Sequence, residues 1–529
     1  MTGTPRSRSS YRSKGLFPLI SLIAVLLAAP LLVVITSPLH RAAPEWPHVL
    51  GTLLPAHLLE TLVLLAGVLL IALVIAVPSA WLIASFQFPL RSVFRWALVL
   101  PLALPTYISA YAYAGLLGPT GSISRWSVAH GGPRPDIVSL PGLCVVLALV
   151  LFPYIYLPTR AAFMRGMRTQ LEAARLLGSG AVDRFLRIAL PLARPAIAGG
   201  ALLLCMETLN DFGAVKYYGV RTLTTGIFRS WGGLYDMGSA LRLSMVLLAL
   251  IAALLWIERR TRKGARQTTD QVPGVPVRLR GTKAWFATGW CSLILLLSLG
   301  LPLGRIISDV FATLDRPVWS DVFPAFGNTV YVAVLAAACT MGIALLFTYR
   351  ERHGERSDVA IRVANLGYAI PGAVIAVAVM ALAGAIDRQG WMSFALIGSI
   401  GLLTYAFTVR FLAVGTQPLY GNLRQQSISL DESARLLGAS PWRTFVRVNL
   451  PLLRPALLVS ALLVTIDVIK ELPLTLVLRP FNFQTLSTTA YELASIEQLR
   501  EASWPALLIV LCGAIPVLLL EKLLARPLR

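Results

Sequence analysis

Stretches of about twenty mostly apolar residues recur along the whole 529-residue chain, and no other feature restricts its fold as strongly. A hydrocarbon core of about 30 Å is crossed by roughly 20 such residues in an α-helix. Charged residues make up only 14% of the chain, whereas an average soluble protein carries about 25%. These values exclude a soluble enzyme and a disordered chain, and they predict an all-α, polytopic membrane protein. The twelve predicted transmembrane helices are residues 16–36, 58–84, 93–117, 137–160, 195–214, 241–258, 285–307, 326–348, 360–385, 391–415, 455–478 and 503–525.

The distribution of Lys and Arg predicts the orientation of this chain in the membrane. Its 47 Lys and Arg against 25 Asp and Glu give a net charge of +22. With the N-terminus inside, 33 basic residues fall in inner segments and 13 in outer segments, in accord with the positive-inside rule. We therefore expect a multi-pass membrane protein with both termini in the cytoplasm. The basic residues lie between apolar runs rather than in polar clusters, so the expected partner is the lipid bilayer and not a nucleic acid.

Two segments of the chain repeat each other. Residues 172–196 and 432–456 are identical at 14 of 25 positions, at an offset of 260. Such self-similarity at a fixed distance indicates that one structural unit occurs twice. Because both repeated loops fall on the inner side, the two copies have the same orientation in the membrane. Weaker matches flank them: residues 60–62 with 328–330, 104–105 with 370–371, and 207–211 with 467–471.

The duplication divides the twelve predicted helices into two homologous halves of six (6+6). A polar segment rich in Arg, Gly and Pro, residues 259–283, joins them. The predicted division is an N-terminal tail and leading helix at 1–54, a first membrane domain at 55–258, a cytoplasmic linker with a second leading helix at 259–325, a second membrane domain at 326–520, and a cytoplasmic tail at 521–529.

Each repeated loop begins with the pattern of a helix capping box. Thr169 lies three residues before Glu172, and Ser429 lies three residues before Glu432. In a capping box the hydroxyl and the carboxylate satisfy free amides of the first turn, so each glutamate is expected there.

Glycine and proline predict where the helices of the loop end. Gly178 and Gly438 are expected to end the first short helix, since glycine is common just past a helix C-terminus. Ser440 and Pro441 suit the first positions of the next helix, which Pro191 and Pro451 are expected to close. Such a rigid projection suggests a docking surface for a partner with two-fold symmetry. The alternative is an amphipathic loop that merely packs on the bundle.

The repeated loops resemble the EAA motif, the cytoplasmic signature loop of type I ABC importer permeases. The residues that carry this resemblance are Glu172, Ala173, Ala174 and Gly178 in the first copy and Glu432, Ser433, Ala434 and Gly438 in the second. Ser433 departs from the alanine of the family pattern. The resemblance spans both halves and implies the type I permease fold, with each loop seated in a cleft of an ATP-binding subunit.

The energy source is expected in other chains. The sequence has no GxxxxGK[ST] phosphate loop, and no catalytic acid-base pair or triad stands out, so the chain is not expected to be an enzyme. The resemblance implies two copies of an ABC ATP-binding subunit, which bind ATP and Mg, and a periplasmic substrate-binding protein. No cofactor is expected on this chain. The alternatives from other classes are a gradient-driven secondary transporter and a membrane-integral enzyme or assembly factor.

A second resemblance concerns the cargo. Fused double-length permeases are typical of the ferric iron importer group, and residues 470–475, 478–481, 485–486 and 211–213 look like its members. This resemblance implies ferric iron as the substrate. Thiamine and phosphonate importers have similar double permeases and remain alternatives.

Acids near the ends of two predicted helices are candidates for the translocation path, because burying a charge in a membrane is expensive. Ferric iron is a hard cation that prefers oxygen ligands, and neighbouring tyrosines would add oxygen donors. The acids could instead pair with lysines or cap helices. The five histidines are dispersed, so the identity of any metal ligand stays unknown. The candidates are Glu207, Asp211, Asp467 and Glu471, with Glu60, Tyr107, Tyr111, Tyr113, Tyr217 and Tyr218 as further oxygen donors.

Overall fold

The computed structural model describes residues 16–39, 44, 46–164, 170, 173–174, 176–262, 276–315, 319–353, 362, 365–390 and 394–524. Almost all of this part is helical, and its only strands are the two-residue β1 (Phe86–Gln87) and β2 (Val277–Arg278), which pair in parallel. The described residues contain seven helices apolar and long enough to cross a membrane, and two further pairs that are bent between their parts. The predicted all-α polytopic class is confirmed.

The described part of each predicted span contains helix, but several spans are not single straight rods. The span at 93–117 is bent by 94° near Pro105, and the span at 137–160 by 44° near Pro153. A proline lacks the amide that would continue the helical bonding, which explains a break at either position. The ninth span begins as a regular helix only at Gly372, after a turn of 3₁₀-helix.

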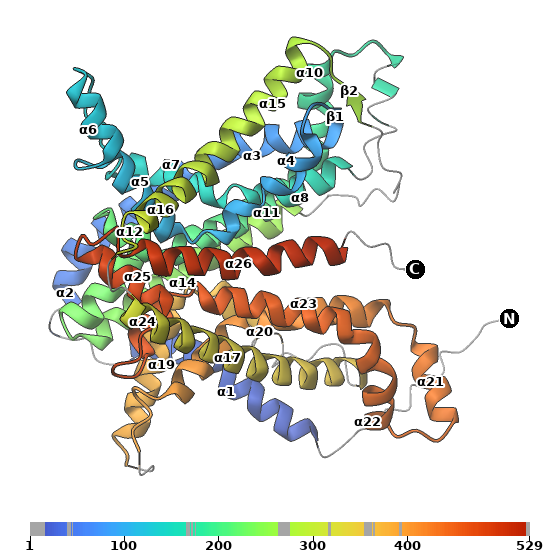
Figure 1. The fold of residues 1–529 in the computed structure, drawn as a ribbon. Helices are drawn as coiled ribbons and strands as arrows, with labels where there is room; N and C mark the ends of the chain where they lie inside the picture. The colour runs from blue at the N-terminus through green and yellow to red at the C-terminus, as the bar shows by residue number, and fades with distance from the viewer. Residues whose placement is uncertain are drawn as a thin grey trace. The chain divides into compact units, whose positions relative to one another are not determined.

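The chain forms two compact units, which we describe separately. Unit 1 comprises residues 1–40, 324–485 and 518–529. In it α20 and α23 pack lengthwise, and α21 and α22 lie at their end (Figure 1). Its described elements are α1 (Leu16–Thr36), η1 (Ser37–Leu39), most of α17 (Trp319–His353), η7 (Asn365–Ala369), α19 (Gly372–Asp387), α20 (Ile400–Gln425), α21 (Ile428–Leu436), α22 (Pro441–Thr444), η8 (Phe445–Asn449), α23 (Leu450–Ile469) and α24 (Pro473–Leu478).

Unit 2 comprises residues 41–323 and 486–517. Its core is built where α3 packs on α7, α8 and α11. Its helices are α2 (Trp46–His48), η2 (Val49–Leu53), α3 (Leu54–Ser85), α4 (Arg91–Ala97), η3 (Leu100–Ala103), α5 (Thr106–Leu117), α6 (Ser122–Ala129), α7 (Leu140–Leu151), α8 (Pro153–Met164), α10 (Ala181–Arg184), η4 (Phe185–Ala189), α11 (Leu190–Asn210), α12 (Gly213–Tyr217), α13 (Leu223–Phe228), η5 (Arg229–Gly233), α14 (Met237–Arg262), α15 (Thr282–Leu295), η6 (Leu296–Gly300), α16 (Leu301–Phe311), α25 (Leu486–Ser495) and most of α26 (Ser503–Leu524).

Each leading helix packs with the repeat that is not its own. In unit 1, α1 lies against α19 of the second repeat, and the Tyr405 hydroxyl donates to the Leu26 carbonyl at 2.7 Å. In unit 2, α16 lies against α5 of the first repeat, and the Trp290 indole nitrogen of α15 donates to the Ser79 hydroxyl at 3.0 Å. The leading helices therefore link each unit to both halves of the sequence.

Local caps reproduce the sequence repeat. Ser139 and Ser399, 260 residues apart, both cap a helix by accepting the amide three residues later. Pro105 and Pro371 have nearly the same backbone angles, and the helices α5 and α19 begin directly after them. Residues at these offsets therefore occupy equivalent positions of the two repeats.

The prediction that Pro191 and Pro451 close a helix is wrong. A π-helical turn, η4 or η8, precedes each proline, and the helix continues through it into α11 or α23. The wider π turn accommodates the missing amide and the ring of the proline. The helix therefore changes its hydrogen-bond spacing at this point and does not end.

Candidate functional site

Both repeated loops end their short helix in the same way. Gly178 has a φ of +82° and Gly438 a φ of +81°, the left-handed conformation that favours glycine. The amide after each glycine bonds five residues back, Ser179 to Ala174 and Ala439 to Ala434, at 3.0 Å in both loops. In each loop this bond is typical of a Schellman C-cap, and it confirms that the two glycines end their helices.

The capping box of the second loop is not as predicted. In the second loop Ser427 is the cap of α21 and accepts the Ser429 amide at 3.2 Å, so Ser429 already lies inside the helix. Glu432 consequently lies in the second turn, where its exposed carboxylate faces solvent. The corresponding Thr169 and Glu172 lie outside the described residues.

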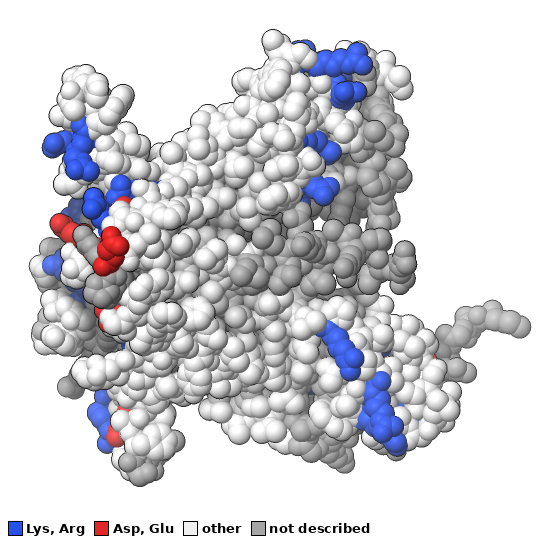
Figure 2. Space-filling view, viewed as in Figure 1, with Lys and Arg blue, Asp and Glu red and all other residues white. Residues whose placement is uncertain are grey.

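A pair of leucines projects from the end of each loop helix. Their exposed fractions are 89% and 87% for Leu176 and Leu177, and 90% and 88% for Leu436 and Leu437. Figure 2 shows Lys and Arg near α22, where Arg443 and Arg447 are exposed. Apolar side chains this exposed at equal positions of two repeats indicate a surface that a partner covers.

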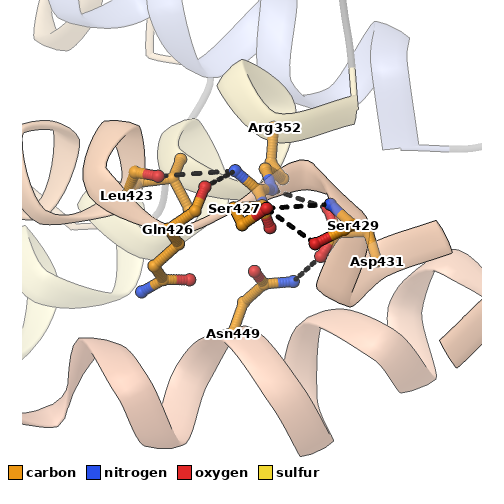
Figure 3. A network of polar contacts seen from close by, with 7 residues as sticks. All are labelled: Arg352, Leu423, Gln426, Ser427, Ser429, Asp431 and Asn449. Atoms are coloured by element: carbon orange, nitrogen blue, oxygen red, sulfur yellow. Dashed lines mark hydrogen bonds and ion pairs between the residues drawn. The ribbon is translucent and has the colours of Figure 1, made fainter. Parts of the chain in front are cut away.

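A buried polar network anchors the second loop to the ends of α17 and α20 (Figure 3). Asp431 of α21 pairs with Arg352 of α17, Oδ2 to Nε at 2.6 Å. It also accepts a hydrogen bond from the side-chain amide of Asn449 at 3.1 Å. Arg352 also donates to the carbonyls of Gln426 and Ser427 at 3.1 and 2.9 Å. Because both charges are paired and hydrogen-bonded, burial leaves neither of them uncompensated.

Sequence reasoning missed this network because the first repeat has no trace of it. At the equivalent offsets the first repeat carries Ala84, Leu171 and Ala189 in place of the arginine, aspartate and asparagine. The available signal was Asp431 itself. This acid lies directly before the motif glutamate, and its counterpart in the first repeat is the apolar Leu171.

An aromatic contact joins each loop to the second helix of its repeat. Trp81 lies 5.3 Å from Phe185, and Tyr349 lies 5.3 Å from Phe445, measured between ring centroids. Phe185 and Phe445 belong to the π turns that follow the loops. The same aromatic contact therefore recurs in both repeats, between the second helix and the π turn that follows the loop.

The acid at the end of α23 is neutralised inside unit 1. Glu471 and Arg410 are both 6% exposed and pair at 3.3 Å, Oε2 to Nε. Arg410 also donates to the Ile370 carbonyl at 3.0 Å, and the Leu474 amide donates to Glu471 at 3.4 Å. A Cβ at Gly372 would collide with the Glu471 carboxylate, so glycine at this position makes room for the ion pair.

The equivalent acid of the first repeat has neutral partners. Asp211 is 6% exposed and accepts the Ala214 and Val215 amides at 3.0 and 3.4 Å. Thr106, which occupies the position of Gly372, also donates a side-chain hydrogen bond to it. Within the described part of the chain Asp211 forms no ion pair. The acid at this position is therefore paired with an arginine in the second repeat and hydrogen-bonded by neutral groups in the first.

The remaining candidates are mostly engaged in structural contacts. Asp467 pairs with Lys470 at 2.9 Å, and Glu60 pairs with Arg221 at 2.6 Å. Glu207 is half-buried near the end of α11. Among the described residues no group of three His, Cys, Asp or Glu could hold a metal ion. The Tyr113 hydroxyl donates to the Leu297 carbonyl, and that of Tyr218 to the Ala110 carbonyl at 3.2 Å.

Comparison with known proteins identifies the class. The family model described as the binding-protein-dependent transport system inner membrane component matches the chain twice, at residues 65–262 and 338–529. The chain belongs to this family and is the permease of an ABC importer.

Relatives support the double-length form. The chain is 28% identical to the Fe(3+)-transport system permease protein FbpB 2 of Haemophilus influenzae, over 95% of this chain and 97% of that protein. It is 22% identical to the ferric transport system permease protein FbpB of Actinobacillus pleuropneumoniae, over 75% and 61%. It is also 29% identical to the spermidine/putrescine transport system permease protein PotB of Haemophilus influenzae, over 37% of this chain and 70% of that one. The resemblance drawn from the sequence motifs is confirmed.

Proposed function

We propose that this permease imports ferric iron across the inner membrane, driven by two ATP-binding subunits that dock on its two loops. The main support is that the two repeated loops have the same structure. Each has a glycine in the left-handed conformation and two leucines that are about nine-tenths exposed. ATP and Mg belong to the docked subunits, and a periplasmic binding protein delivers the cargo. Ferric iron is supported by the full-length similarity to a ferric permease and by residues 470–475.

We further propose that both loops and both termini face the cytoplasm, with permease domains at 55–258 and 326–520. The excess of Lys and Arg in the segments assigned to the inside supports this orientation. Each loop then enters a cleft of one ATP-binding subunit. The first loop does so with residues 172–174 and Gly178, and the second with residues 432–434 and Gly438.

Removing the two motif charges tests the docking. We expect Glu172→Gln with Glu432→Gln to reduce ATP-driven uptake at least about tenfold, because an interfacial charge that loses its partner costs about 1.4 kcal/mol or more. The exposed Glu432 lies in the second turn, so folding of the loop should be unaffected. Asp183→Asn is the matched control, since this loop acid forms an exposed ion pair with Arg187, four residues later.

Normal coupling in the double variant would refute docking through these glutamates. Uptake that continues after ATP depletion, with the ion gradient intact, would favour the gradient-driven transporter. The cargo needs its own assay, in which a strain lacking the chain is grown on chelated iron. Normal growth there combined with starvation for thiamine would replace iron by thiamine.

A further inference from the structure

The two repeats differ most clearly around their equivalent acids, and this difference points to a site. In the second repeat Arg410 neutralises Glu471, as described above. In the first repeat Asp211 is held by amides and a hydroxyl, and no Lys or Arg of the described residues pairs with it. A buried carboxylate that has only neutral partners can be stabilised further by a cation from outside the chain.

Phenol side chains cluster on the helices next to Asp211. Tyr111 lies 5.8 Å from Tyr107 and 4.7 Å from Tyr217 between ring centroids. The ring of Phe212, the residue directly after Asp211, lies 5.8 Å from that of Tyr491 of α25. The cluster therefore combines residues of α5 and α12 with one residue of α25, all within unit 2.

The hydroxyl of Tyr111 is the second sign of a missing partner. Its side chain is 6% exposed, and its hydroxyl makes no hydrogen bond with any described residue. Burying such a group unsatisfied costs about 1–3 kcal/mol. A cation that is coordinated by this oxygen would remove the cost.

The fold itself does not require these hydroxyls. The second repeat forms the same helices with Ala373, Val377 and Val477 at the positions of Tyr107, Tyr111 and Tyr217. Tyr491 corresponds to Phe228, which keeps the ring and lacks the hydroxyl. Each of the four oxygen atoms therefore occurs in one repeat only, three in the first and that of Tyr491 in the second, as expected of a binding function and not of packing.

We infer that Asp211 and the phenol oxygens of Tyr107, Tyr111, Tyr217 and Tyr491 form a transient binding site for a hard trivalent cation. Carboxylate and phenolate oxygens suit such a cation, and tyrosine is an established ligand of ferric iron. Binding to a phenol oxygen releases its proton to water and changes no oxidation state. The Tyr111 ring packs on those of Tyr107 and Tyr217 at ordinary aromatic distances.

This inference rests on the proposed import of ferric iron, and iron binding to the purified full-length chain in lipid nanodiscs tests it. With ferric nitrilotriacetate as the probe, we expect the visible charge-transfer band of a phenolate–iron bond. Tyr111→Phe and Asp211→Asn should each weaken iron binding by about tenfold or more, as losses around metal sites do. Tyr113→Phe is the matched control on the same helix, because its hydroxyl already donates to the Leu297 carbonyl.

A wild-type chain without the band, or equal iron affinity in Tyr111→Phe and Tyr113→Phe, would overturn the site. Displacement of the iron by thiamine at similar concentration would also overturn it, in favour of an organic cation. These failures are separable from failure of the proposed function. If the site fails while ferric uptake in cells still requires this chain, only the inference falls, whereas iron uptake that is normal without the chain removes the proposed function.

Discussion

At the scale of single residues, Gly372 determines whether the charge pair in unit 1 can exist. A Cβ at this position would meet the Glu471 carboxylate and lie 3.2 Å from an Arg410 nitrogen. We expect Gly372→Ala to separate the two charges, and breaking a buried pair typically costs about 3–5 kcal/mol. The measurement is the thermal unfolding temperature of the purified protein in detergent, which should fall clearly.

The matched control is Gly421→Ala in α20. No heavy atom lies within 4 Å of a Cβ built there, and the site is helical. Alanine should therefore be neutral or stabilise the helix by up to about 1 kcal/mol. An unfolding temperature for Gly372→Ala equal to that of Gly421→Ala would show that the pair tolerates the methyl group.

At the scale of elements, the network of Asp431 and Arg352 fixes the second loop to its bundle. We expect Asp431→Leu and Arg352→Met to destabilise the protein by about 3–5 kcal/mol each, because each leaves an unpaired buried charge. The double variant should recover most of this loss, since the first repeat has apolar residues at the equivalent positions. A double-mutant cycle of unfolding temperatures measures the coupling.

The same cycle contains the result that would contradict the network. Additive effects of the two substitutions would mean that the contacts in Figure 3 contribute no joint stability. Uptake measured on the double variant then tells whether the polar anchor is needed only for stability or also for coupling.

At the scale of the whole molecule, the exchanged leading helices predict the result of cutting the chain. A protease site placed at residue 270 separates residues 1–270 from 271–529. Each compact unit contains helices of both fragments, α1 in unit 1 and α15 with α16 in unit 2. We expect both fragments to remain together through affinity purification in detergent after complete cleavage. Separation of the fragments would show that the leading helices do not hold the halves together.

Local patterns predicted much of the coupling loops, but not what fixes them in place. The glycines at 178 and 438 and the cap at Ser440 follow from local backbone rules, and the structure confirms them. The capping box at Ser429 and Glu432 was wrong because Ser427 competes for the same helix start. The partners of Asp431 are 79 residues before it and 18 after it, distances at which no local rule operates.

The sequence by itself determined that this chain is a duplicated, helical membrane protein, because apolar length and self-similarity are properties of the linear chain. The resemblance of its loop motif added that it is a permease. Only the tertiary structure decided which acid has a cation beside it and with which repeat each leading helix packs. Both depend on contacts between residues far apart in the chain, and Asp211 and Glu471 are indistinguishable until their surroundings are folded around them.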